Sequence, residues 1–486
     1  MNINEGYLVK ELLTNLSSNK VLLDKEIIKL YTMESSGLSG DAIAVVFPED
    51  SDDVSKVISI AYKYGFPVYG QGSSSSLSGN AVPLKKGIVV SFERMNRLKE
   101  VSILDSIAIV EPGIRIEELN NILEEKGYMF PIDPSSQSVA TIGGAINNGA
   151  GGLRGAKYGT MKDWVNGLEI VLPDENGTKL RIGCLTLKCR QGYDLVRLII
   201  GSEGTLALVT EAILRITPIP EKVVTALALF NDINDLLNSF IQIKSSGVQP
   251  FIAEFMDDKT VEIASKGVDL DFVPKGHMFL VSIDTTNEST NRFGNWLLDL
   301  FKKNNATDIH IALTQEEADE KGLFKIRRNL FASQVQMGRD ILGKNKSKVF
   351  IEDIVVPPSK IPLAVSKFRE ISNKYGLLMS LGGHIGDGNL HPSVNYDPND
   401  EEMKKKVYNW FKEIMKASLD LNGSISAEHG IGVLKKEGLK MELMHKSSDK
   451  NIELMKSIKS IFDPKAILNP NKIFDITNNN DDAINI

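Results

Sequence analysis

The stretch Leu381–His391 reads LGGHIGDGNLH, and a second stretch, Ser426–Gly432, reads SAEHGIG. The chain has six histidines, and three of them, His384, His391 and His429, lie in these two segments. Imidazole is the commonest metal ligand, and its ordinary pKa lies near neutrality. This clustering indicates a chemical centre, from which we interpret the rest of the chain.

The two segments together offer the side chains of a catalytic metal site. His384 and His391 lie seven positions apart, and Glu428 and His429 follow in the later segment. Three protein ligands with a fourth position left open are typical of catalytic rather than structural metal sites. The alternative is that each histidine is a hydrogen-bonded structural residue in a glycine-rich loop. Spacing alone leaves both interpretations open.

The composition is that of a globular protein with more than one core. The chain has 486 residues, of which 42% are hydrophobic and 24% are charged. Single cores stop growing near about 250–300 residues, so we expect at least two domains. The net charge of −7 argues against nucleic acid as the main partner.

The sequence predicts neither a membrane or secretory signal nor a structural role for its cysteines. No run approaches the ~20 apolar residues of a membrane-spanning helix, and the start, MNINEGYLVKELL, lacks the apolar core of a secretory signal. We therefore expect a cytoplasmic protein without a transmembrane segment. Cys184 and Cys189 are the only cysteines. We expect them to be small residues in a loop and a strand, since two thiols form neither a disulfide framework nor a zinc site.

The first half of the chain predicts a β-α-β unit that ends in a Gly/Ser-rich loop. Leucines at helical intervals predict helices within residues 1–36. The strands and helices expected next are Ala42–Phe47, a helix from Asp50 to Gly65, Pro67–Tyr69, Ile88–Phe92, Ile107–Val110, Ile116–Lys126 and Leu206–Ile216. An Asn-Gly turn within Leu168–Ile182 predicts a β-hairpin. Pro218 and Pro220 then indicate a domain boundary.

The second half predicts alternating strands and helices, an order that suits a sheet covered on one side by helices. The expected elements are Val224–Phe230, Ile233–Ser245, Phe251–Met256, Met278–Ile283, Asn291–Lys303, Ile309–Ala312, Glu316–Gln336, Leu363–Tyr375 and Glu401–Leu419.

The loop Gly70–Asn80, GQGSSSSLSGN, directly follows a predicted strand. Its backbone N–H groups and serine hydroxyls suit an anion nest for phosphate, although a Ser/Gly run is also typical of a flexible loop. Two further segments rich in small residues, Pro131–Gly152 and Gly201–Ala212, favour the first interpretation because a flat ligand can lie against their backbone.

The order of these motifs resembles a known flavoprotein superfamily. P-V-(x)3-G-(x)2-S from Pro67, P-x-D-P-S-S from Pro131, A-T-I-G-G from Ala140 and G-S-E-G-T-L from Gly201 are similar to the vanillyl-alcohol oxidase and p-cresol methylhydroxylase superfamily. H-I-G-D-G-N-L-H and E-H-G-I-G narrow the resemblance to the branch of D-lactate dehydrogenases, glycolate oxidase catalytic subunits and D-2-hydroxyglutarate dehydrogenases. It extends from about Ala42 to Phe474.

The resemblance implies an α+β fold in three parts. Residues 1–218 would form a two-part FAD-binding domain, with N-terminal helices in 1–36. Residues 219–430 would form a ferredoxin-like α+β cap domain that carries the metal and catalytic motifs. Residues 431–486 would form a helical segment that packs back toward the FAD domain.

The resemblance also implies the residues around FAD. By position they are Gly70, Gln71, Gly72, Ser73, Ser74, Ser75, Ser76, Ser78, Asp133, Pro134, Ser135, Ser136, Thr141, Gly143, Gly144, Glu203, Gly204, Thr205 and Val209. Relatives carry Arg-Gly-(x)-Gly-Thr-Gly where this chain has Gln71–Ser76, so a positive charge and two glycines are absent. No His or Cys lies between Phe66 and Gly87, which predicts non-covalent FAD.

For catalysis, the resemblance assigns His384, His391 and Glu428 as metal ligands and His429 as the base. The ligand set suits zinc, with manganese or iron as alternatives. Arg327 matches the arginine that binds the substrate carboxylate. We also expect Asn389 near the substrate, or else as a residue that shapes its loop.

The implied function is flavin-dependent oxidation of a 2-hydroxy acid to a 2-oxo acid. The electron acceptor would be a quinone, a cytochrome, an electron-transfer flavoprotein or oxygen; a homodimer and peripheral membrane contact are left open. One alternative is a metal-dependent hydrolase, which would leave the Ser/Gly loop unexplained and would be colourless. The other is a flavoprotein subunit that only relays electrons, which Arg327 and His429 argue against.

Overall fold

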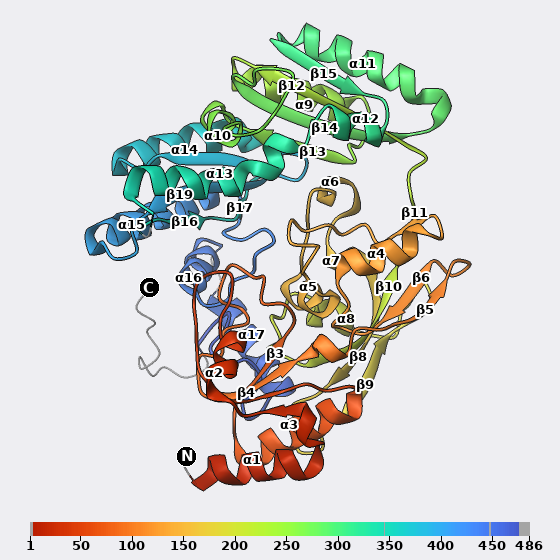
Figure 1. Cartoon of the computed structure of the whole chain (residues 1–486), viewed down its shortest axis with the longest axis vertical. Coiled ribbons are helices and arrows are strands. Elements are labelled where there is room, and N and C mark those ends of the chain that lie inside the picture. The colour runs from red at the N-terminus through yellow and green to blue at the C-terminus, as the bar shows by residue number, and fades with distance from the viewer. Residues whose placement is uncertain (1–2, 345, 447–448, 476–486) are drawn as a thin grey trace. The chain divides into compact units, whose positions relative to one another are not determined.

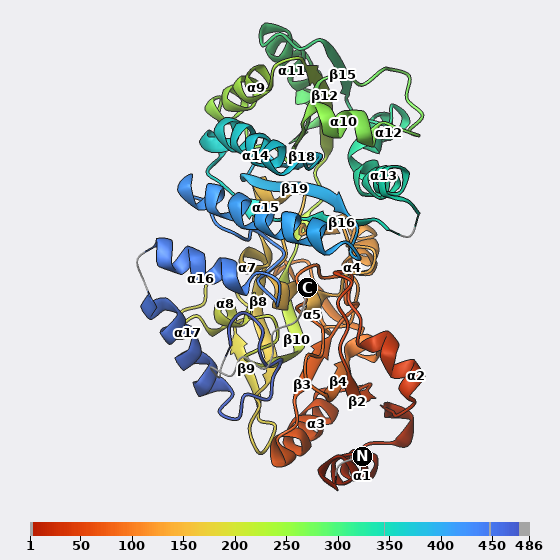
Figure 2. The ribbon, with the colours of Figure 1, turned by 90° about the vertical axis from the view of Figure 1, so that its left-hand side faces the viewer.

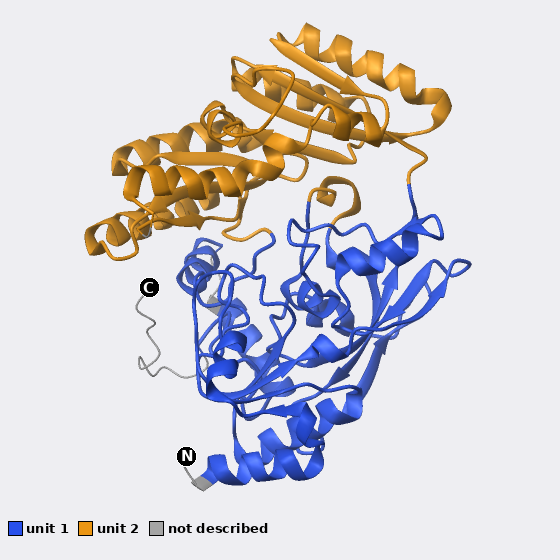
Figure 3. Ribbon diagram, viewed as in Figure 1, with its two compact units in different colours: residues 1–152, 160–219, 428–486 blue, residues 153–159, 220–427 orange. Residues whose placement is uncertain are grey.

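The computed structural model describes residues 3–344, 346–446 and 449–475 (Figure 1). The chain separates into two compact units (Figure 3). Unit 1 contains Met1–Gly152, Thr160–Ile219 and Glu428–Ile486, and unit 2 contains Leu153–Gly159 and Pro220–Ala427. Residues 431–486, predicted as a separate C-terminal segment, are part of unit 1.

The first sheet of unit 1 carries the predicted β-α-β unit. Its strand order is β1-β2-β4-β3, and β4 pairs in parallel with both β2 and β3. The elements are β1 (Val21–Leu22), β2 (Ala42–Val46), α3 (Ser51–Tyr64), β3 (Val68–Gln71) and β4 (Gly87–Ser91).

Helix α3 begins and ends where its capping residues predict. The Asp50 side chain accepts a hydrogen bond from Asp53 N, and Gly65 ends the helix with φ of 71°. The helix packs beside α1 (Ile3–Asn15), as Figures 1 and 2 show. Their shared core contains Leu8, Leu12, Val54, Val57, Ile58, Val46, Val68, Val90, Ile467 and Leu468.

The prediction of helices throughout residues 1–36 is wrong in part. Only α1 and the short α2 (Lys25–Ile28) are α-helical there, and Val21 and Leu22 pair with β2 instead. The reason is tertiary pairing: two β-favouring residues complete the edge of a sheet, which outweighs the helical spacing.

The second sheet of unit 1 is antiparallel, with strand order β5-β6-β10-β8-β9. The strands are β5 (Leu98–Ser102), β6 (Ile107–Val110), β8 (Val165–Val171), β9 (Lys179–Gly183) and β10 (Leu208–Arg215). β8 and β9 confirm the predicted hairpin. Helix α4 (Ile116–Glu124) follows β6 as expected, and α5 (Ile142–Asn148) lies in the segment rich in small residues, Pro131–Gly152, where no helix was predicted.

The expectation for the two cysteines is wrong. Cys184 and Cys189 are joined by a disulfide, with Cα atoms 5.9 Å apart. The chain turns back immediately after β9 and brings both side chains within the spacing that a disulfide requires. Sequence spacing alone does not reveal this turn.

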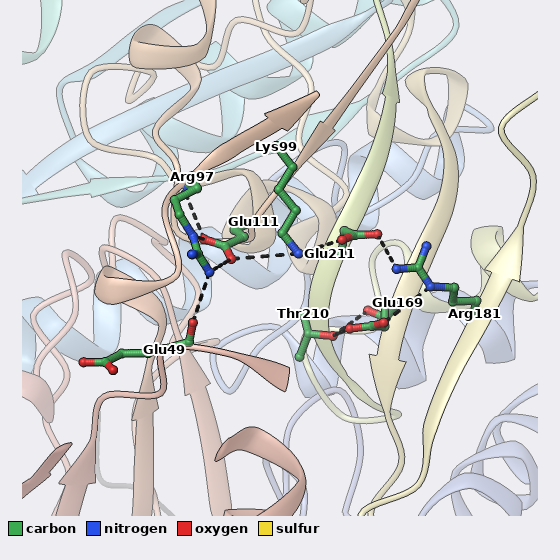
Figure 4. A network of polar contacts seen from close by, with 8 residues as sticks. All are labelled: Glu49, Arg97, Lys99, Glu111, Glu169, Arg181, Thr210 and Glu211. Atoms are coloured by element: carbon green, nitrogen blue, oxygen red, sulfur yellow. Dashed lines mark hydrogen bonds and ion pairs between the residues drawn. The ribbon is translucent and has the colours of Figure 1, made fainter. Parts of the chain in front are cut away.

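A row of alternating charges crosses the second sheet (Figure 4). Glu169 and Glu211 lie directly opposite each other on β8 and β10, where like charges repel. Arg181 offsets this repulsion because its guanidinium lies 3.0 Å from Glu211 and 3.5 Å from Glu169. Lys99 continues the row, with Nζ 2.7 Å from Glu211 and 3.9 Å from Glu111.

Glu111 is the buried end of this row. Arg97 donates to it from Nη2 at 2.6 Å, from Nε at 3.0 Å and from the backbone N at 2.9 Å. Burial alone would raise the pKa of Glu111, but the hydrogen bonds and charges of Arg97 and the charge of Lys99 hold that pKa below its ordinary value. The carboxylate is therefore ionised at neutral pH.

Unit 2 is built on one antiparallel sheet with strand order β15-β12-β14-β13-β18-β19-β16, and β17 pairs with β19. The strands are β12 (Lys222–Phe230), β13 (Ile252–Met256), β14 (His277–Thr285), β15 (Asp308–Ala312), β16 (Lys348–Ile351), β17 (Ile354–Val355), β18 (Met379–His384) and β19 (Asn389–Tyr396). β16, β17, β18 and β19 were not predicted, and β18 and β19 contain the first histidine motif, which was interpreted as a glycine-rich loop. The α+β fold class is confirmed.

Helices cover both faces of this sheet, so the expectation of helices on one side only is wrong. They include α9 (Ile233–Ser245), α10 (Asp258–Ala264), α11 (Thr290–Lys303), α13 (Lys325–Leu342), α14 (Ile361–Tyr375) and α15 (Glu401–Asp420). Figure 2 shows α14 and α15 on one side of β18 and β19, and α13 on the other. The single helix predicted at 316–336 is two, because the chain breaks at Gly322, where φ is 65°, between α12 (Gln315–Glu320) and α13.

We expect Glu111→Ala to lower the free energy of unfolding by about 2–3 kcal/mol, because it removes an acceptor that binds a guanidinium. Glu100→Ala, at an exposed position of β5, is the control and should change it by less than about 0.5 kcal/mol. Urea unfolding measures both. Equal effects of the two substitutions would contradict the role of Glu111.

Candidate active site

A pocket in unit 1 is formed mainly by three segments that are far apart in the sequence. They are the loop after β3, the stretch around α5, and the turn before β10. Its lining includes most of the residues that the resemblance implied for FAD: Gly70, Gln71, Gly72, Ser73, Ser74, Ser75, Ser76, Pro134, Ser135, Ser136, Thr141, Gly143, Gly144, Glu203, Gly204 and Val209. Ser78, Asp133 and Thr205 are not in the lining but are buried close by in sequence.

The far end of the Gly/Ser loop is fixed by two buried charged side chains. Glu34 accepts hydrogen bonds from Gly79 N and Ala81 N, each at 2.7 Å. Lys472 donates from Nζ to Gly79 O at 2.6 Å and to Val82 O at 2.7 Å. Burial lowers the pKa of Lys472 to about 7, against the charges of Glu34 and Glu203. The first and last segments of the chain therefore hold the loop in one conformation.

The same pocket is lined by Glu428 and His429. The backbone of this segment is held by Glu203, whose carboxylate accepts from Ile431 N at 2.7 Å and from Gly432 N at 2.8 Å. Asn148 Nδ2 donates to Glu428 O at 2.7 Å.

Gly430 is required at the bend of this segment. Its φ is 77°, and a Cβ there would lie 2.8 Å from both Asn80 Nδ2 and Glu203 Oε1. His429 Nε2 lies 3.9 Å from Glu428 Oε1. The sequence therefore places the predicted base and the predicted carboxylate ligand on a tightly held turn in the lining of the pocket.

In unit 2, strand register puts the two motif histidines on one face of the sheet. Glu254 on β13 lies opposite His384 on β18, and His384 lies opposite Asn389 on β19. Directly opposed residues of antiparallel strands share a face, and so do residues two positions apart. His391 therefore joins this face. Its ring and that of His384 have centroids 5.3 Å apart and are nearly perpendicular.

Helix α13 covers this face and supplies Arg327. Arg327 Nε donates to Glu254 Oε2 at 2.7 Å, and Gln334 of the same helix donates to Ser393 on β19. The neighbouring Arg328 is largely exposed, with Asp319 at 3.8 Å, so it is a surface residue.

Glu254 and Asp353 are buried acids beside the motif histidines that the sequence analysis missed. Glu254 Oε1 is hydrogen-bonded to His384 Nδ1. Burial alone would raise the pKa of Glu254, but the charges of His384 and Arg327 and their hydrogen bonds lower it. A single acid within the apolar run FIAEFM, residues 251–256, is the pattern that could have drawn attention to it.

Asp353 lies beside the second histidine. Its Oδ1 is 3.9 Å from His391 Nδ1, and its Oδ2 accepts from Ala427 N at 2.9 Å and from Ser426 Oγ at 3.1 Å. Asp353 thus anchors the residues that immediately precede Glu428. Asn389 is buried, and its backbone N donates to Asp387 Oδ1 at 3.1 Å. This hydrogen bond fits the expectation that Asn389 shapes its loop, and its contact with the substrate stays a prediction.

These surroundings fit both FAD and a divalent metal. Among the described residues that line the pocket of unit 1 there is neither lysine nor arginine, so serine hydroxyls and backbone N–H groups would bind the phosphates, as in other anion nests. In unit 2, His384 Nδ1 is hydrogen-bonded to Glu254, so Nε2 is the ring nitrogen that would coordinate a metal.

Comparison with known proteins agrees with this geometry. A family model for the FAD binding domain matches residues 42–183, and one for FAD linked oxidases, C-terminal domain, matches residues 219–473. The chain belongs to the FAD-linked oxidase family. This confirms the resemblance found in the sequence, and the chain is an FAD-linked oxidoreductase of the glycolate oxidase and D-lactate dehydrogenase type.

The chain matches three similar proteins over most of their length. Glycolate oxidase subunit GlcD of Bacillus subtilis is 35% identical over 432 residues, 89% of this chain and 88% of that one. D-lactate dehydrogenase of Archaeoglobus fulgidus is 34% identical over 443 residues, 90% of this chain and 92% of that one. The mitochondrial D-lactate dehydrogenase [cytochrome] of Arabidopsis thaliana is 32% identical and covered over 73% of its length.

A solved structure supports the fold. p-Cresol methylhydroxylase with substrate bound has a TM-score of 0.78 at 17% identity and covers 99% of this chain and 98% of its own. The likeness shows the vanillyl-alcohol oxidase type of fold. Among the described residues, no helix has both the length and the apolarity needed to cross a membrane.

We expect the stability of the FAD-linked oxidase to depend on pH through Glu203. Burial raises its pKa to about 7, although the hydrogen bonds from Ile431 and Gly432 lower it. The native state keeps this proton between about pH 4.5 and pH 7, where the unfolded state has released it. The contribution of Glu203 to the free energy of unfolding is therefore fully present at low pH and is lost as pH rises through that window.

The measurement is urea unfolding of wild type and Glu203→Gln at saturating FAD from pH 4.5 to pH 8. As pH rises, the free energy of unfolding of the wild type should fall by up to about 1.4 kcal/mol per pH unit relative to that of the variant. Parallel curves for the two proteins would contradict a raised pKa at Glu203.

Proposed function

We propose that the chain oxidises a 2-hydroxy acid, such as D-lactate, glycolate or D-2-hydroxyglutarate, to the 2-oxo acid. Two features of the chain together carry this proposal. His429 lies in the lining of a pocket formed by the FAD-binding motifs, and Arg327 shares the carboxylate of Glu254 with His384, whose ring faces His391. Relatives named glycolate oxidase subunit and D-lactate dehydrogenase support this substrate class.

Arg327 is proposed to bind the carboxylate of the substrate. Its Nε is engaged by Glu254, so its two terminal nitrogens remain for two parallel hydrogen bonds to a carboxylate, a geometry that lysine cannot provide. This contact would fix the orientation of a 2-hydroxy acid before reaction.

His429 is proposed as the general base that accepts the hydroxyl proton of the substrate. Neutral imidazole is suited to this task near pH 7. Glu203 and Asn148 support the role because they hold the backbone on either side of His429. When bound, FAD supplies the acceptor for the α-hydrogen and its electron pair.

His384, His391 and Glu428 are proposed to hold a divalent cation. Two imidazoles and one carboxylate suit zinc, with manganese or iron as alternatives. When bound, such a cation acts as a Lewis acid that stabilises negative charge on the substrate oxygen. The chain has only two cysteines, too few for an iron–sulfur cluster, so the electrons must pass to a quinone, a cytochrome, an electron-transfer flavoprotein or oxygen.

We expect His429→Asn to retain FAD while the rate of flavin reduction by a 2-hydroxy acid falls about 10²–10⁴-fold, the usual contribution of a general base. Anaerobic stopped-flow absorbance measures this rate. His445→Asn, at an exposed position of the same unit, is the control and should reduce at the wild-type rate. Reduction of the His429 variant at that rate would refute the assignment.

Metal removal provides a separate test. Treatment with a chelator, followed by gel filtration, should abolish turnover while the flavin absorbance spectrum is preserved, and added zinc or manganese should restore turnover. Full activity in protein shown by elemental analysis to be metal-free would mean that His384 and His391 are structural residues.

A further inference from the structure

Glu254 is a fully buried acid beside the proposed catalytic groups of unit 2. It lies in the middle of β13, and its side chain is 0% exposed. Its strand neighbours Ala253 and Phe255 are buried and apolar. A carboxylate in such a place is strongly destabilising unless charged or hydrogen-bonding partners surround it. The identity of those partners therefore indicates why the acid is there.

Each oxygen of Glu254 has a different partner. Oε2 accepts from Arg327 Nε at 2.7 Å, and Oε1 is hydrogen-bonded to His384 Nδ1. The first partner comes from helix α13 and the second from strand β18. One carboxylate thus joins the guanidinium proposed to bind substrate to an imidazole proposed to bind metal.

Each hydrogen bond fixes the orientation of the side chain that donates it, His384 in one case and Arg327 in the other. With Nδ1–H of His384 donating to Glu254, the lone pair of this imidazole is on Nε2, so Nε2 is the nitrogen that would coordinate a metal. With Nε of Arg327 donating to the same carboxylate, the plane of the guanidinium is fixed and its terminal nitrogens remain for a ligand. Removing the carboxylate would release both at once.

We propose that Glu254 is a positioning residue that couples recognition of the substrate carboxylate to metal binding. This inference rests on the proposed function, because it takes Arg327 as the carboxylate-binding group and His384 as a metal ligand. Glu254 touches neither substrate nor metal; it acts through these two side chains.

The substitution that tests it is Glu254→Gln, which keeps the size of the side chain. Glutamine has one acceptor oxygen and one donor amide, whereas both partners are donors. One of the two hydrogen bonds must therefore be lost. We expect zinc affinity to fall about 10–100-fold, as for other residues that orient metal-binding histidines, and KM for the 2-hydroxy acid to rise.

A matched control is available three residues along the chain. Asp257 is also a buried acid of unit 2 with an arginine partner, Arg369, at 3.2 Å, but it caps helix α10 instead of contacting Arg327 or His384. Asp257→Asn makes the same chemical change. It should lower stability without changing zinc affinity or KM, which separates a positioning role from a structural one.

Zinc content is measured by elemental analysis after dialysis against buffered zinc, together with FAD content, KM and kcat. Arg327→Ala and His384→Ala are measured beside Glu254→Gln. If Arg327→Ala raises KM and His384→Ala loses zinc while Glu254→Gln does neither, this inference is wrong and the proposed function stands. If Arg327→Ala and His384→Ala also leave KM and zinc unchanged, the proposed function itself fails.

Discussion

A buried carboxylate must be surrounded by donors, and this constraint shapes both units of the chain. Glu203 in unit 1 and Glu254 in unit 2 are 5% and 0% exposed. Glu203 accepts the backbone N–H groups of Ile431 and Gly432, and Glu254 accepts from Arg327 and His384. In each case the donors belong to a segment that carries a proposed catalytic group. Satisfying the buried acid therefore fixes the position of that group, because any movement would leave a buried polar group without its hydrogen-bond partners.

Each unit holds a different part of the proposed site. Unit 1 forms the pocket of the FAD-binding motifs and holds His429 on the turn that Gly430 allows. Unit 2 uses strand register to place two imidazoles on the sheet face that helix α13 covers. The chain passes between the units at Ala427 and Glu428. Residues on both sides of that bond are held within their own unit, since Asp353 binds Ala427 N and Asn148 binds Glu428 O.

Local patterns in the sequence predicted local structure and the family. The caps of α3, the Asn-Gly hairpin and strands β12, β13, β14 and β15 of unit 2 were found from periodicity and turn residues, and several motifs in a fixed order indicated the flavoprotein fold. Contacts between distant strands could not be predicted in this way. Glu254 meets His384 only because β13 pairs with β18 in one register, and Asp353 meets His391 across β19. The disulfide between Cys184 and Cys189 likewise depends on a turn that spacing does not reveal.

The central claim is that electrons pass from a 2-hydroxy acid to FAD in this chain. It is tested most directly by anaerobic titration of the purified protein with D-lactate, L-lactate, glycolate and D-2-hydroxyglutarate, followed by the visible absorbance of the flavin. The account predicts a yellow protein whose oxidised-flavin absorbance is lost on addition of at least one of these acids, with one molecule of 2-oxo acid formed per flavin reduced. A colourless protein, or flavin that none of the acids reduces, would contradict it.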